Sequence, residues 1–214
     1  MLAATSGFGQ APRIALDSLR IEDNYCVIDF HVDSLLNQNL LAGMRRGLTS
    51  SAQFRVQLWR KRGLWFGSTL LATRQYEIKS TYDQWEQKYV LITPGEKRLT
   101  NKIDGVRQRW EQHHGVALIE TMKLRPSQRY FVTIELQIEP LSKETLNAIR
   151  GWLAGEVKSM PADSADTGDE QKHIDVPERF LQMLLNVTGF GKRMLSMKSE
   201  MFELTAGGAI EKVK

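Results

Sequence analysis

Apolar and polar residues alternate along much of the first 140 positions, which is the period of a half-buried β-strand. In 129–139, every second residue from Tyr130 to Ile138 is apolar, and the residues between them are polar or charged apart from Phe131. Segment 24–33 alternates in the same way. Strands of this kind are expected over 14–21, 24–33, 53–61, 69–80, 84–93, 116–124 and 129–139. About seven such strands predict a mostly-β fold, an antiparallel β-sandwich of immunoglobulin-like architecture.

Three short helices are expected beside these strands. Residues 35–46 and 102–114 carry apolar side chains at helical spacing. Gly47 and Gly115 follow them, in the position where a left-handed glycine commonly ends a helix. A third helix is expected over 143–154, after a serine that can cap its N-terminus.

Composition divides the chain into five parts. Residues 1–11 are a flexible N-terminus that also resembles the last part of a signal peptide. Residues 12–154 form the β-sandwich domain. Residues 155–175 are acidic and poor in large apolar groups, so they cannot offset their ordering entropy and are expected to be a disordered linker. Residues 176–205 are expected to be an amphipathic helical tail, and 206–214 a flexible C-terminus.

The expected tail carries two apolar stripes at helical spacing. The candidate contact residues are Phe180, Leu184, Met194, Met197 and Met201. Methionine stripes adapt to irregular partner grooves, which favours contact with another protein. Docking on its own domain and lying on a membrane surface are the alternatives.

Charge and cysteine content narrow the function classes only slightly. The 214 residues carry a net charge of +4 and include a single cysteine, which excludes an internal disulfide. No apolar run approaches the ~20 residues that cross a bilayer. No cofactor is indicated, and the oligomeric state stays open.

The strongest chemical feature is a basic stretch with large aromatic residues. No aspartate or glutamate occurs between Ser34 and Tyr76. The candidate anion-binding residues are Trp59, Arg60, Lys61, Arg62, Trp65, Arg45 and Arg46. Cations beside aromatic rings suit lipid head groups or single-stranded nucleic acid. The alternative is a solvated hairpin tip whose tryptophans pack on the end of the domain.

Asp29, His31 and Asp33 share the outward face of one expected strand. Carboxylate and imidazole groups together bind zinc and similar ions, so these residues are weak metal candidates and would carry a metal-dependent enzyme. Alternating polar residues on a solvent-facing sheet are the simpler interpretation. Since no catalytic residue pattern can be singled out, we expect a protein that is not an enzyme.

The order of elements resembles a known bacterial family. An isoleucine-rich strand, a tyrosine-led strand and a leucine helix ending in glycine are followed by the tip 59–65 and by strands around Tyr76 and Tyr89. Over residues 12–153 this is similar to the bacterial domain of unknown function family 4390. The resemblance implies a β-sandwich of the cell envelope with no assigned activity, whose genes often lie beside those of membrane sensor kinases. The chain departs from the family in lacking the expected signal peptide and in its C-terminal extension.

The function expected from these observations is a non-catalytic binding or interaction domain of the bacterial cell envelope, with a membrane sensor kinase as a candidate partner. It would be periplasmic or envelope-associated if a signal peptide precedes Met1, and cytoplasmic if the N-terminus is as written. The alternatives are a cytoplasmic or membrane-surface binder of nucleic acid or phospholipid, and a metal-dependent enzyme.

Overall fold

The computed structural model describes residues 11–63, 67–140, 192–205 and 209–213. Within them the chain is mostly β, with two α-helices and one 3₁₀ turn. The elements, in chain order, are β1 (Arg13–Glu22), β2 (Tyr25–Asp33), α1 (Gln38–Arg45), β3 (Ser50–Lys61), β4 (Ser68–Asp83), β5 (Lys88–Thr93), β6 (Glu96–Thr100), α2 (Ile103–Glu111), β7 (Gln112–Glu120), the 3₁₀ turn Thr121–Lys123, β8 (Arg129–Glu139), β9 (Arg193–Lys198), β10 (Phe202–Leu204) and β11 (Ile210–Lys212).

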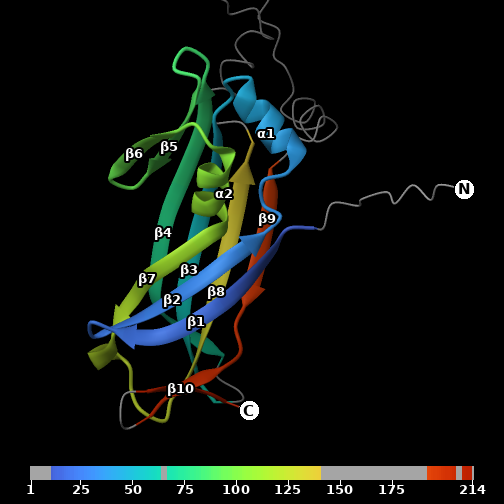
Figure 1. Cartoon of the computed structure of the whole chain (residues 1–214). Helices are drawn as coiled ribbons and strands as arrows, with labels where there is room; N and C mark the ends of the chain where they lie inside the picture. The colour runs from blue at the N-terminus through green and yellow to red at the C-terminus, as the bar shows by residue number, and fades with distance from the viewer. Residues whose placement is uncertain (1–10, 64–66, 141–191, 206–208, 214) are drawn as a thin grey trace, which may run out of the picture.

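The strands form two antiparallel sheets. The smaller sheet has the order β1-β2-β7. The larger has the order β11-β10-β8-β3-β4-β5-β6, and β9 pairs with β8 beside β10. Figure 1 shows the smaller sheet running diagonally across the central strands of the larger one, with α1 at one end of the molecule.

The core lies between the two sheets. Phe30 of β2 and Phe54 of β3 are fully buried, and their ring centroids lie 6.0 Å apart. The inward residues of β8 are the five that the alternation predicts: Tyr130, Val132, Ile134, Leu136 and Ile138. Burial also raises the pKa of the Cys26 thiol to about 12, so this cysteine stays protonated and inert.

The tail differs most from the sequence prediction, because β9 and β10 replace the helix expected over Met194–Leu204. In β9 the side chains alternate, with Leu195 and Met197 against the core and Met194 exposed. The helical spacing of the methionines was misleading, since this segment also has a period of two and the edge of β8 offers it a hydrogen-bonding partner. Ile210–Lys212, expected within a flexible C-terminus, pairs with β10 as β11.

The two central helices were predicted in type but not in length. Helix α1 begins after Asn37, whose side chain accepts a hydrogen bond from the Leu40 N–H, and ends before Gly47 as expected. Helix α2 ends at Glu111, and β7 follows at once. The third expected helix, 143–154, lies outside the described residues. In the described part of the chain, no helix is both long and apolar enough to cross a bilayer.

Gly115 explains why the C-terminal end of the second helix was predicted wrongly. It lies inside β7 with φ +67°, opposite a register shift between Ile28 and Phe30 of β2. Glycine in the left-handed conformation occurs both at helix ends and in β-bulges. The presence of a glycine in the sequence therefore could not show which of the two structures forms here.

Candidate binding surface

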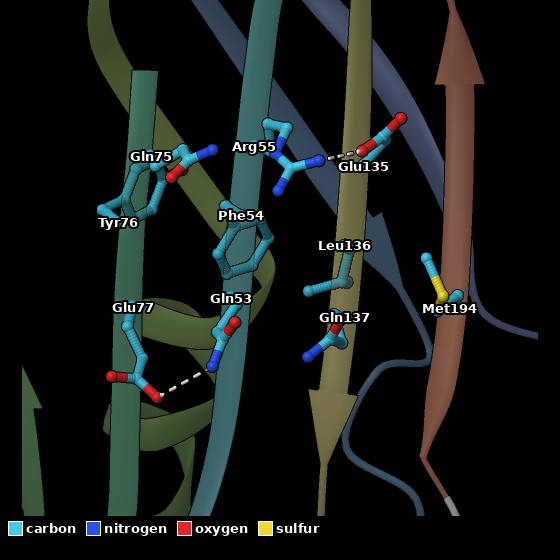
Figure 2. Close-up of a pocket in the computed structure, with 10 residues that line it drawn as sticks. All are labelled: Gln53, Phe54, Arg55, Gln75, Tyr76, Glu77, Glu135, Leu136, Gln137 and Met194. Atoms are coloured by element: carbon cyan, nitrogen blue, oxygen red, sulfur yellow. Dashed lines mark hydrogen bonds and ion pairs between the residues drawn. The ribbon is translucent and has the colours of Figure 1, made fainter. Parts of the chain in front are cut away.

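The outer face of the larger sheet, turned away from the core, carries a band of hydrogen-bonding side chains. Sheet register places Arg55 of β3 between Gln75 of β4 and Glu135 of β8. The neighbouring rung places Gln53 between Glu77 and Gln137. Met194 of β9 closes the row beside Gln137. Together with Phe54, Tyr76 and Leu136, which lie between them, these side chains line a hollow of about 280 Å³, the outer-face depression (Figure 2).

Most contacts within the depression are long. The Gln53 amide donates to Glu77 at 3.4 Å, and an Arg55 guanidinium nitrogen lies 3.3 Å from a Glu135 carboxylate oxygen (Figure 2). Exposed pairs at this distance contribute only about 0–1 kcal/mol to stability, so they exchange easily for contacts with a ligand. Gln75 makes no side-chain hydrogen bond to a described residue. The surface therefore offers donors and acceptors side by side on a rigid sheet.

A buried histidine lies behind this surface. His113 of β7 is 4% exposed and packs on the rings of Phe30 and Phe54, with centroids 4.5 and 4.2 Å away. Its Nε2 lies 3.1 Å from the Trp110 carbonyl oxygen, which can only accept, so Nε2 carries the proton. Nδ1 therefore accepts from the Tyr76 hydroxyl at 3.0 Å.

This environment keeps His113 neutral. Burial, with smaller effects from Arg109 and His114, lowers the pKa of His113 to about 4, although its hydrogen bond to Trp110 works in the opposite direction. Burial likewise raises the pKa of Tyr76. We interpret the pair as a polar contact that fixes the packing of the two sheets.

The structure divides the predicted basic cluster. Arg45 and Arg46 lie at the C-terminal end of α1, where the Arg45 Nε donates to the Tyr89 hydroxyl at 3.3 Å. Arg60 and Lys61 lie at the far end of β3, ten and eleven positions beyond Ser50. At about 3.4 Å per residue, the strand alone separates its two ends by roughly 37 Å. The two groups do not form one anion-binding surface.

Trp59 is used in packing. Its ring is parallel to that of Phe131, with centroids 6.2 Å apart, and its Nε1 donates to the Thr133 hydroxyl at 3.0 Å. The Lys198 ammonium lies 4.2 Å from the centroid of the Phe131 ring. Trp65 lies outside the described residues. The packing interpretation of Trp59 is therefore the one that its contacts favour.

The cations of the tip form no ion pair with a described residue. They are Arg60, Lys61 and Arg62. Replacing all three with serine is expected to weaken binding to anionic vesicles or oligonucleotides at low salt if the tip binds anions. The melting temperature should change by only a few degrees, because exposed charges contribute little to stability. Co-sedimentation at two salt concentrations measures the binding, and a wild type that binds neither probe would remove this hypothesis.

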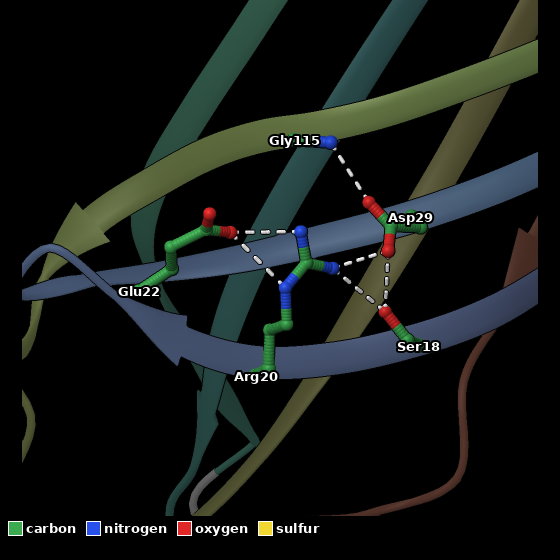
Figure 3. A network of polar contacts seen from close by, with 5 residues as sticks. All are labelled: Ser18, Arg20, Glu22, Asp29 and Gly115. Atoms are coloured by element: carbon green, nitrogen blue, oxygen red, sulfur yellow. Dashed lines mark hydrogen bonds and ion pairs between the residues drawn. The ribbon is translucent and has the colours of Figure 1, made fainter.

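The Asp29 carboxylate accepts hydrogen bonds from residues of the two neighbouring strands. One carboxylate oxygen accepts from the Ser18 hydroxyl at 2.7 Å and from Arg20, and the other accepts from the Gly115 N–H at 2.8 Å (Figure 3). Partial desolvation acts to raise the pKa of Asp29, but these three donors outweigh it and the pKa is lowered. Arg20 also contacts Glu22 at 2.8 Å. Asp29 thus fixes the β-bulge at Gly115.

The predicted metal ligands are accordingly not assembled into a site. His31 Nδ1 lies 2.5 Å from Asp17 Oδ1, and its Nε2 lies 3.6 Å from Asp33 Oδ1. Both ring nitrogens face carboxylates rather than a shared ligand position. Among the described residues, no group of three His, Cys, Asp or Glu is arranged to hold a metal ion.

The structure also scatters the predicted tail contacts. Phe180 and Leu184 lie outside the described residues. Met197 packs against the core and Met201 is half-buried, whereas Met194 is 69% exposed beside the outer-face depression. Of the predicted tail contacts that the structure describes, only Met194 joins the binding surface. Sequence reasoning identified the outward-facing Gln137 and Glu135 as strand residues, but their alignment with β3 and β4 could not be read from separate segments.

These features define a class of protein: a mostly-β domain of two antiparallel sheets with a polar, hydrogen-bonding outer face. The family described as Domain of unknown function (DUF4390) matches residues 11–143, and the chain belongs to this family. The match confirms the resemblance drawn from the order of elements. No curated protein and no solved structure matches the chain.

Proposed function

We propose that this chain is a non-catalytic interaction domain of the bacterial cell envelope, whose partner binds the outer-face depression. The observation that carries the proposal is the hollow across β4, β3 and β8, which Gln53, Gln75 and Gln137 line with amide groups. Amides both donate and accept, so they suit the polar surface of a folded protein. Exposed Met194 adds an adaptable apolar contact at the rim.

The residues that line the outer-face depression favour binding of a partner over catalysis. Among the described residues that line it there is no histidine, cysteine, serine, threonine or lysine. Nucleophilic catalysis usually needs such a group within hydrogen-bond reach of a base, and the carboxylates of the lining, Glu77 and Glu135, have none of them beside them in the depression. Arg55 and Glu135 already neutralise each other.

We also infer the finer architecture and the cellular setting. A β-sandwich of immunoglobulin-like type is supported by two facing sheets that share one core. The periplasmic side of the envelope is supported by the family's implied location, and a membrane sensor kinase is the proposed partner. An anion-binding role through the basic tip is the second candidate, because Arg60, Lys61 and Arg62 have no ion pair among described residues.

Site-specific crosslinking tests the main proposal. A photo-crosslinking residue at Gln75, expressed in bacterial cells, is expected to capture one membrane-bound partner, since Gln75 lies in the depression. The matched control is Glu22, on the outer face of the smaller sheet, which should capture nothing specific. Substituting Arg55→Glu should abolish the adduct, because it reverses the charge in the depression and places a second carboxylate beside Glu135. Equal adducts from Gln75 and Glu22, or an adduct insensitive to Arg55→Glu, would contradict the proposal.

A further inference from the structure

A second hollow lies on the other side of the larger sheet, away from the outer-face depression. The β5–β6 hairpin, α2 and the beginning of β7 enclose a cleft of about 320 Å³. It shares no lining residue with the outer-face depression. Thr93 and Arg98 come from the hairpin, Gln108 and Arg109 from α2, and Gln112 and His114 from β7.

The cleft brings together two arginines and a histidine from three different elements. Sheet register places Arg98 opposite the buried Leu91, which turns it toward α2. Arg109 lies on the facing side of α2. Neither arginine has an ion pair with a described residue, whereas Arg107 of the same helix contacts Asp104. Glu96 is the one carboxylate among the described residues that line the cleft.

Two guanidinium groups at one cleft repel each other unless an anion lies between them. The uncharged lining residues Gln108 and Gln112 add donors suited to oxygen acceptors. The positive field extends into the core, because Arg109 and His114 each lower the pKa of His113. An anion in the cleft would oppose that field.

We propose that this cleft binds a phosphate group, with Arg98 and Arg109 as the principal donors and the His114 imidazole as a third hydrogen-bond donor. Arginine matches phosphate with paired, charge-assisted hydrogen bonds. The phosphate can belong to a free phosphate compound or to a lipid head group, and both present the same tetrahedral oxyanion. This site is independent of the partner surface proposed above.

The test uses the full chain and inorganic phosphate at low ionic strength and neutral pH, followed by calorimetry and by amide chemical shifts. Saturable binding with a dissociation constant of about 1 mM or below is expected. The double variant Arg98→Gln/Arg109→Gln should bind at least about tenfold more weakly, since charge-assisted hydrogen bonds are lost. The matched control Lys97→Gln/Arg107→Gln removes the same charge from the same two elements outside the cleft and should bind as the wild type does.

A second arm separates the two sources of phosphate. Vesicles of phosphatidic acid in phosphatidylcholine are compared with phosphatidylcholine alone. Binding to the phosphatidic acid vesicles that fails in Arg98→Gln/Arg109→Gln but survives in the control pair supports the site with a lipid head group as its ligand. Binding of inorganic phosphate without vesicle binding supports it with a free phosphate compound. Equal loss in both double variants, or no binding of either probe by the wild type, would overturn the proposal.

Discussion

Phe202→Ala is expected to lower the free energy of unfolding by about 3–5 kcal/mol, the usual cost of removing a large aromatic side chain from a core. Phe202 is 4% exposed in β10, and its ring centroid lies 5.7 Å from that of Tyr130. Leu204 on the same strand is 6% exposed. For a chain of this size the melting temperature should fall by roughly 10 °C. Thermal and urea unfolding followed by circular dichroism measure both quantities.

Met194→Ala is the matched control within the tail. Its side chain is 69% exposed, so the expected change is within about 0.5 kcal/mol. Deleting residues 192–214 should lower the free energy of unfolding more than either substitution does, because it removes two buried side chains and leaves the edge of β8 unpaired. A deletion that unfolds at the wild-type temperature would show that β9 and β10 are not part of the sheet.

Limited proteolysis provides an independent test of the pairing between β9 and β8. The acidic composition of 156–175 predicts that a nonspecific protease cuts there first. Since β9 pairs with β8 over Thr133–Ile138, the two fragments should remain together on gel filtration and separate only in denaturant. Release of a free C-terminal fragment under native conditions would contradict the strand pairing.

The alternation of side chains made most of the large sheet predictable. In 129–139 it gave both the strand and its inward face, because a half-buried strand leaves a strict period of two. The alternation did not predict β6, because Glu96–Thr100 is mostly exposed and has no alternation of apolar and polar residues to detect. It failed again for β9, where Met194, Met197 and Met201 satisfied a helical spacing while the neighbouring Leu195 satisfied a strand.

The binding surfaces were less predictable than the fold because they depend on register between strands. Arg55 lies in the basic stretch between Ser34 and Tyr76, where no carboxylate is near in sequence, yet in the sheet it faces Glu135, eighty positions away. Arg98 and Arg109 were not singled out, since they belong to different elements and only the packing of α2 on the hairpin brings them to one cleft. His113 was assigned to a helix end, whereas the bulge at Gly115 shifts it into the core.

Acidification should lower the free energy of unfolding over a pH window set by the pKa of His113. Its pKa is about 4 in the folded protein against 6.5 for a free histidine. The unfolded state therefore binds more protons between these values, so stability is fully present above pH 6.5 and is lost as pH falls toward 4. At about 1.4 kcal/mol per pH unit the loss is roughly 3 kcal/mol. Asp29, whose pKa is lowered from 3.8, contributes stability that is lost mainly below that pH, so its effect falls at the acid end of the window.

His113→Gln is expected to flatten this pH dependence, because the neutral amide has no proton to gain. The variant is also expected to be less stable at pH 7, since it loses the stacking on Phe30 and Phe54. The slope of stability against pH, rather than its absolute value, is therefore the quantity to compare. His114→Gln is the control: this neighbouring side chain is exposed and affects the pKa of His113 less than burial does, so its removal should leave most of the slope in place. Urea unfolding between pH 7 and 4 supplies the slopes, and a wild-type slope retained in His113→Gln would exclude His113 as its source.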